Sequence, residues 1–114
     1  MNNKFIKLIS MAILPLGMAL VVPASAAADL KAGRAAFDAS SCGSCHHASA
    51  TTIGPSLKEI ARRYHGKPVA AELAQRIRAG SAGRWGEVPH PAYEGMDASD
   101  ALLMATWILG GAPR

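Results

Sequence analysis

Apolar residues are distributed in two different ways along this chain of 114 residues. An almost unbroken apolar run covers residues 8–22, with two lysines before it and a stretch of small residues ending at Ala26 after it. A positive start, a short apolar middle and an A-x-A end are typical of a secretory signal peptide. We therefore expect residues 1–26 to be a cleaved leader, with cleavage after Ala28 as the nearest alternative. An uncleaved membrane anchor is the rival interpretation, which the shortness of the run and its internal proline and glycine disfavour.

Beyond the leader, apolar residues recur every three or four positions, which is the period of an amphipathic helix. Leu73 and Ile77 show this spacing in one stretch. Helix start and stop signals delimit four such stretches. They run from Asp29 to Ala39, from Ser56 to the turn at Gly66, from Val69 or Ala70 to Ala79, and from Asp97 to the turn at Gly110. Ser56 and Glu59 have the spacing of a capping box. The pattern predicts an all-α domain.

The segment from Gly80 to Met96 has no regular period. Its 17 residues include four glycines and two prolines. An irregular segment of this length in a small domain is usually functional. We therefore expect an ordered loop that supplies part of a site.

The clearest chemistry lies in Cys42-Gly43-Ser44-Cys45-His46, a C-x-x-C-H pattern. Two thiols at this spacing can form thioethers to the two vinyl groups of one porphyrin, and the histidine that follows can bind its iron. A structural zinc site would need four ligands, and the chain has no second pair. A thioredoxin-like pair would accompany a βαβ pattern, and a disulfide between Cys42 and Cys45 would close too short a loop to stabilise the fold much. The pattern predicts one covalently attached haem c, with His46 as an axial ligand.

Charge and size narrow the remaining function classes. The whole chain has a formal charge of +4, but the leader holds two of the basic residues, which leaves ten basic residues against eight acidic ones. This balance, without a basic recognition motif, does not favour nucleic-acid binding. The expected mature chain, residues 27–114, is one small domain whose core is marginal alone, and a buried haem would supply the missing apolar contacts.

These motifs together resemble the class I monohaem cytochromes c of the short bacterial subgroup. The resemblance covers residues 33–109. Beside C-x-x-C-H, its marks are Ile53-Gly54-Pro55-Ser56, residues 72–77, the stretch from Gly80 to Gly86, and Leu103-x-x-x-Trp107-Ile108-Leu109. It implies a fold of about four helices wrapped around one covalently bound haem. It also implies that Gly33 and Phe37 of the first helix pack on the last helix around Trp107.

The resemblance implies roles for individual residues. The two motif cysteines hold the haem, His46 is the proximal ligand, and the Pro55 carbonyl accepts a hydrogen bond from its ring, which would fix the ring orientation. Arg76 and Trp85 match positions that bind the haem propionates, a role that suits the forked guanidinium of arginine. Ordinary core packing is an equal alternative for Trp85.

The resemblance breaks at the second axial position. The family has a methionine between two prolines in the long loop, where this chain has Pro89-His90-Pro91. Three outcomes are open: His90 binds the iron, Met96 replaces the usual methionine, or neither binds and the site stays open to a small gas molecule. We favour His90, because two flanking prolines stiffen the backbone and imidazole is a good ligand for iron. Met96 can instead pack on Ala101 at the start of the last helix.

The expected function is that of a periplasmic single-electron carrier. Ligation by both His46 and His90 would lower its potential, since a second imidazole favours ferric iron. No nucleophile–base arrangement indicates an enzyme. We expect a monomer that binds redox proteins transiently, binds no nucleic acid and meets a membrane only through partner complexes. The alternatives are a haem-based gas-binding or sensor module with a labile sixth ligand, and the haem subunit of a larger oxidoreductase.

Overall fold

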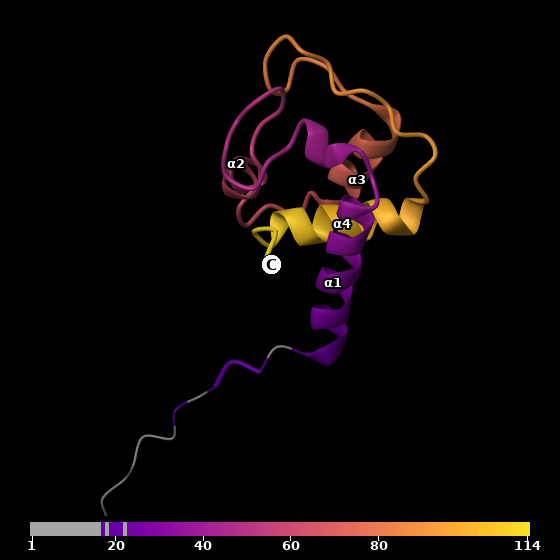
Figure 1. The fold of residues 1–114 in the computed structure, drawn as a ribbon. Coiled ribbons are helices and arrows are strands. Elements are labelled where there is room, and N and C mark those ends of the chain that lie inside the picture. Colours follow the sequence, from indigo (N-terminus) through magenta and orange to yellow (C-terminus); the bar gives the residue numbers. More distant parts are fainter. Residues whose placement is uncertain (1–16, 18, 22) are drawn as a thin grey trace, which may run out of the picture.

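The structure is a computed structural model that describes residue 17, residues 19–21 and residues 23–114, so the expected leader lies mostly outside the described residues. In this part of the chain, four α-helices and one 3₁₀ turn make up the fold (Figure 1). They are α1 (Ala24–Asp38), η1 (Cys42–Ser44), α2 (Leu57–Arg63), α3 (Ala70–Ala79) and α4 (Ala98–Leu109). Within the described part of the chain, no helix combines the length and the apolar character needed to cross a membrane. The prediction of an all-α fold with four helices is confirmed.

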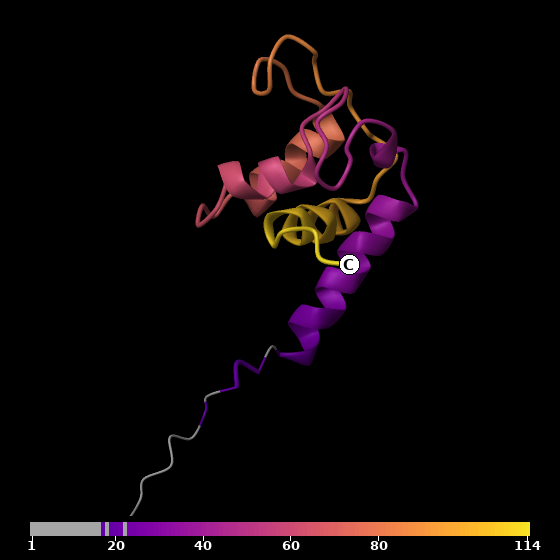
Figure 2. The same cartoon turned by 60° about the vertical axis from the view of Figure 1, so that its left-hand side comes forward.

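Helix α1 crosses α4 at very short range (Figure 2). A Cβ added to Gly33 would lie 2.2 Å from the carbonyl oxygen of Leu103 and 2.7 Å from Cβ of Trp107, so only glycine lets the two backbones approach this closely. One turn further on, the Phe37 ring packs on Trp107 with ring centroids 5.2 Å apart. The predicted contact between the first and last helices is confirmed.

The start of α1 differs from the prediction. The helix begins at Ala24, and Asp29 lies inside it instead of capping it. Four of its first five residues are alanine, which has the highest helix propensity, so the helix extends back to Pro23. It therefore includes both predicted cleavage positions, Ala26 and Ala28.

The remaining helices begin at predicted residues. Ser56 and Glu59 form both halves of the capping box of α2, although this helix ends at Arg63, earlier than the expected stop at Gly66. At α4, the Asp97 carboxylate accepts a hydrogen bond from the backbone N–H of Ser99 at 2.7 Å.

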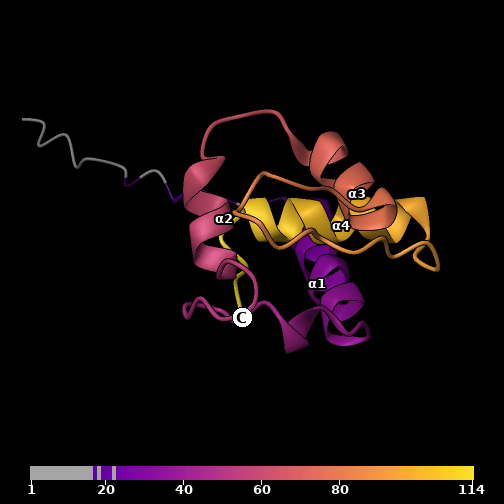
Figure 3. The ribbon, with the colours of Figure 1, turned by 90° about the horizontal axis from the view of Figure 1, so that it is seen from above.

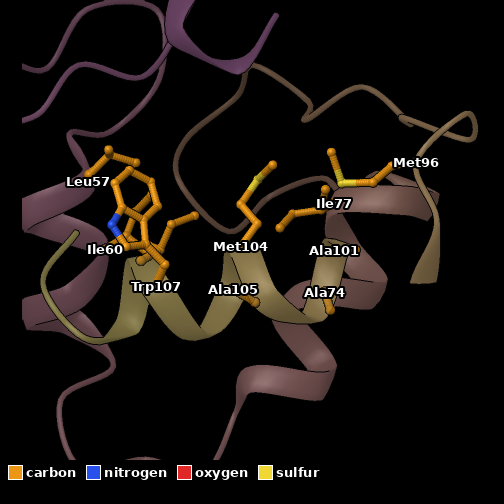
Figure 4. Packing of buried hydrophobic residues seen from close by; sticks show 10 residues of the cluster. Leu57, Ile60, Ala74, Ile77, Met96, Ala101, Met104, Ala105 and Trp107 are labelled. Atoms are coloured by element: carbon orange, nitrogen blue, oxygen red, sulfur yellow. The ribbon is translucent and has the colours of Figure 1, made fainter. Parts of the chain in front are cut away.

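The core lies where α4 meets the other helices (Figure 4). Helix α4 is largely apolar and is buried on several sides, with Ala101, Met104 and Ala105 fully buried. Side chains of α2 and α3 and the end of the long segment complete the cluster: Leu57, Ile60, Ala74, Ile77 and Met96.

The segment between α3 and α4 contains no helix, as expected. Figures 1 and 3 show it on the same side of α4 as the loop that follows η1. Its second half is held at the C-terminal end of α3, because the backbone N–H of Tyr93 donates to the carbonyls of Ile77 and Arg78. Two segments that are far apart in the sequence therefore lie on the same side of α4.

Candidate haem-binding site

A cavity of about 310 Å³ lies between these two segments. Its walls come from η1 and the loop after it, from α2, α3 and α4, and from the long segment. Most of the side chains that line it are apolar, and both motif cysteines and His46 lie among them. Cys42 and Cys45 are free thiols and are partly exposed, so both can form thioether bonds to a group in the cavity.

One wall of the cavity holds the His46 imidazole in a fixed position. Its Nδ1–H donates to the Pro55 carbonyl oxygen at 2.8 Å, the contact that the resemblance implied. A Cβ added to Gly54 would lie 2.7 Å from Cε1 of His46, so the Gly54 backbone packs directly on the ring. The backbone N–H of Gly54 also donates to the Cys45 carbonyl at 3.0 Å, which joins the loop to the motif. The ring thus has its Nδ1 bonded, which leaves Nε2 as the nitrogen for a metal.

His90 faces His46 from the long segment. Its backbone N–H donates to the Ser81 carbonyl at 2.7 Å, and the Ser81 N–H donates back to the His90 carbonyl at 3.1 Å. Gly80 makes this pairing possible, since its φ is +78° and a Cβ there would lie 2.8 Å from the His90 carbonyl oxygen. The prolines on either side restrict the backbone further. The position of His90 is therefore set by the end of α3.

The two imidazoles fit one metal ion between them. Their ring centroids are 6.0 Å apart and their planes are inclined by 32°. Two imidazoles bound on opposite sides of one metal ion through bonds of about 2.1 Å have centroids roughly 6.5 Å apart. Nδ1 of His90 is buried and has no hydrogen-bond partner in the described part of the chain. Burial, and secondarily the nearby His46, lower the pKa of His90, which favours the neutral form of the ring that binds metals.

Met96, the alternative sixth ligand, lies elsewhere. Its side chain is 8% exposed and packs in the core with Ile77 and Ala101 (Figure 4). It is not among the residues that line the cavity. Met104 of α4 is fully buried and does line the cavity. Its spacing of three residues from Ala101 and from Trp107 places it on the buried face of α4, and this spacing is the signal that could have identified it.

Arg76 and Trp85 both line the cavity, as expected for residues near haem propionates. The Arg76 guanidinium donates to Glu72 and to the Tyr64 hydroxyl, the latter at 3.2 Å. Trp85 is 38% exposed, and the guanidinium of Arg63 lies 4.2 Å from its ring centroid.

Arg84 is a further basic residue on the cavity wall, a place that no sequence motif predicted for it. It lies 3.7 Å from Glu72. Its only sequence signal is its place beside Trp85 in the long segment.

The match to known proteins agrees with this geometry. The model of the family described as cytochrome c matches residues 30–111. The chain belongs to the cytochrome c family. This cytochrome is 38% identical to cytochrome c-551 of Allochromatium vinosum over 93 residues, which cover 81% of this chain and 95% of that protein. It is 41% identical over 91 residues to cytochrome c-552 of Nitrosomonas europaea, covering 75% of this chain and 88% of the relative.

Solved structures agree with the fold. The crystal structure of wild-type Nitrosomonas europaea cytochrome c552 matches with a TM-score of 0.58 and 38% identity, over 73% of this chain and 96% of that one. This cytochrome is accordingly a class I monohaem cytochrome c that carries one covalently attached haem c, and its function is electron transfer.

Proposed function

We propose that this cytochrome is an exported single-electron carrier whose haem iron has two histidine ligands, His46 and His90. The observation that carries the proposal is the separation of 6.0 Å between the two rings across the cavity. The location of Met96 in the core supports the same ligand pair.

The haem supplies the one-electron redox couple, and the residues around it set its potential. The Pro55 carbonyl raises the basicity of His46, and a second neutral imidazole favours ferric iron more than a thioether does. The double pairing with Ser81 keeps His90 in place in both oxidation states, so little rearrangement accompanies the gain or loss of an electron. We therefore infer a lower potential than methionine ligation would give.

This cytochrome acts in the periplasm and binds its redox protein partners transiently. The leader pattern of residues 1–26 supports export. Ile53 and Val88 line the cavity although they are 65% and 64% exposed, so apolar side chains lie at its mouth. A small apolar surface of this kind suits transient binding between this cytochrome, as a monomer, and a redox protein partner.

The near-infrared spectrum of the ferric protein, with its haem covalently attached, tests the proposed ligand pair. Wild type is expected to show the low-spin spectrum of two imidazoles without an iron–methionine charge-transfer band. His90→Ala is expected to lose that spectrum, while the control Met96→Leu keeps it, because leucine fills a similar volume in the core. A methionine band in wild type, or a low-spin spectrum that His90→Ala leaves unchanged, would refute His90 ligation. Rapid binding of carbon monoxide by the reduced wild type at neutral pH would favour the gas-binding alternative.

A further inference from the structure

One peptide group connects the proximal histidine to a carboxylate. The carbonyl of the peptide between Pro55 and Ser56 accepts the hydrogen bond of the His46 ring at 2.8 Å. The N–H of the same peptide, on Ser56, donates to Oε2 of Glu59 at 2.9 Å. The carboxylate, the peptide and the imidazole therefore form one continuous hydrogen-bonded chain.

Glu59 is held firmly at the far end of this chain. Its Oε2 also accepts from the Ser56 hydroxyl at 2.8 Å and from the Thr51 hydroxyl. The hydrogen bond from Thr51, followed by those from the backbone and side chain of Ser56, lowers the pKa of Glu59 to about 2. The carboxylate is thus ionised at any pH at which the protein operates. Thr51 belongs to the loop that follows the motif, and its backbone pairs with His46.

The negative charge of Glu59 strengthens the hydrogen-bond acceptor of His46, which is the Pro55 carbonyl oxygen. A carboxylate that accepts from a peptide N–H polarises the peptide, and this makes its carbonyl oxygen a stronger acceptor, since hydrogen bonds in a chain strengthen one another. A stronger acceptor at Nδ1–H increases the electron density on the imidazole and so its basicity as a metal ligand. A more basic ligand stabilises ferric iron relative to ferrous iron.

We propose that Glu59 is a positioning residue that acts through the Pro55–Ser56 peptide to increase the basicity of His46 and lower the reduction potential. The inference rests on the proposed function in one respect, namely that His46 is an axial ligand of the haem. It is independent of whether His90 is the other ligand.

A purely structural role for Glu59 predicts different results. Glu59 is half of the capping box of α2, and a cap stabilises its helix whether or not any charge reaches His46. Glutamine also forms a capping box, so Glu59→Gln removes the charge while it retains the cap. Ser56→Ala does the opposite: it removes the capping hydroxyl, which accepts from the Glu59 N–H at 3.1 Å and donates to the Glu59 carboxylate, but keeps the peptide N–H and the negative charge. The two variants separate the charge from the cap.

The experiment measures the potential of the haem-loaded protein together with the proton NMR signal of His46 Nδ1–H in the reduced state. Glu59→Gln is expected to raise the ferrous-to-ferric ratio at a fixed ambient potential by about three- to tenfold, where tenfold corresponds to about 59 mV for one electron. Its Nδ1–H signal should move upfield because the hydrogen bond is weaker. Ser56→Ala is expected to lower the unfolding midpoint while leaving the potential and the NMR signal near those of wild type. The control Glu94→Gln makes the same charge change at an exposed residue outside the cavity lining and should leave both unchanged.

The salt dependence of the potential distinguishes an effect transmitted through the hydrogen bonds from an effect of surface charge. The shift caused by Glu59→Gln should persist at 1 M salt, where the Debye length is about 3 Å and exposed charges are screened. The inference is overturned if Glu59→Gln and Glu94→Gln shift the potential equally, if the shift disappears at high salt, or if the His46 signal does not move. The His46→Ala variant is expected to lose the low-spin haem spectrum of wild type, and this loss would support the axial role of His46. If that spectrum survives, the proposed ligation fails whatever Glu59 does.

Discussion

Gly54→Ala tests whether the loop backbone really holds the proximal imidazole. The φ of Gly54 lies outside the left-handed region, so alanine can adopt the same backbone, and the change acts only through its added methyl group. That methyl carbon would lie 2.7, 2.9 and 3.2 Å from Cε1, Nδ1 and Nε2 of His46. The shortest of these is about 0.7 Å inside ordinary van der Waals contact, so either the ring or the loop must move by that amount. Movement of either one lengthens the hydrogen bond to the Pro55 carbonyl.

The expected cost can be bounded from these contacts. Overpacking against a fixed group costs about 1–3 kcal/mol, and a weakened hydrogen bond adds about 1 kcal/mol. Replacing glycine by alanine restricts the unfolded chain, which offsets about 0.4–1 kcal/mol. The net loss is about 2 kcal/mol, and a loss of this size in a domain of this length lowers Tm by roughly 8–16 °C.

The assay is guanidinium unfolding of the haem-loaded protein, followed by far-UV circular dichroism, with the His46 Nδ1–H signal as the local probe. Gly43→Ala is the matched control, because Gly43 lies in the C-x-x-C-H motif next to this loop and its added methyl would be 3.8 Å from the Phe37 ring, an ordinary contact. We expect the control to be as stable as wild type. Equal stability of the two variants, with an unmoved His46 signal in Gly54→Ala, would refute the close packing of Gly54 on the ring.

Two further predictions concern the helices that support the site. Gly33→Ala is expected to lower the free energy of guanidinium unfolding by about 2–3 kcal/mol, because the added methyl meets the backbone of α4 at Leu103 and no rotamer change can relieve this contact. The control Ala32→Gly, at an exposed position of α1, should cost only about 1 kcal/mol through its lower helix propensity. A Gly33→Ala variant as stable as wild type would mean that α1 and α4 are further apart. The hydrogen bonds from Ser99 lower the pKa of Asp97, so its contribution to the free energy of unfolding is complete above the ordinary aspartate pKa of 3.8 and is lost as the pH falls below it towards the folded value. Asp97→Asn keeps a capping side chain without the charge, so wild type should exceed it in Tm at neutral pH and match it at low pH; a constant difference across this range would contradict the assignment.

Local sequence patterns determined much of this cytochrome. Helix periodicity, the capping box at Ser56 and the cap at Asp97 depend on residues within a few positions of one another, and the structure confirms them. The C-x-x-C-H pattern likewise identified the cofactor, because two thiols and an imidazole in one turn form a single chemical unit. The predicted start of α1 at Asp29 was wrong, because the high helix propensity of the alanines before Asp29 outweighed the capping signal.

Which side chain of the long segment faces His46 was decided only by the tertiary structure. The sequence left His90 and Met96 as competing ligands, because both lie in one irregular segment and no local rule gives the direction of a side chain there. The end of α3 fixes His90 through Ser81 so that it faces His46, whereas Met96 reaches the core just before α4 begins. Helix packing and pairing across the cavity, rather than spacing along the chain, bring these groups together or keep them apart.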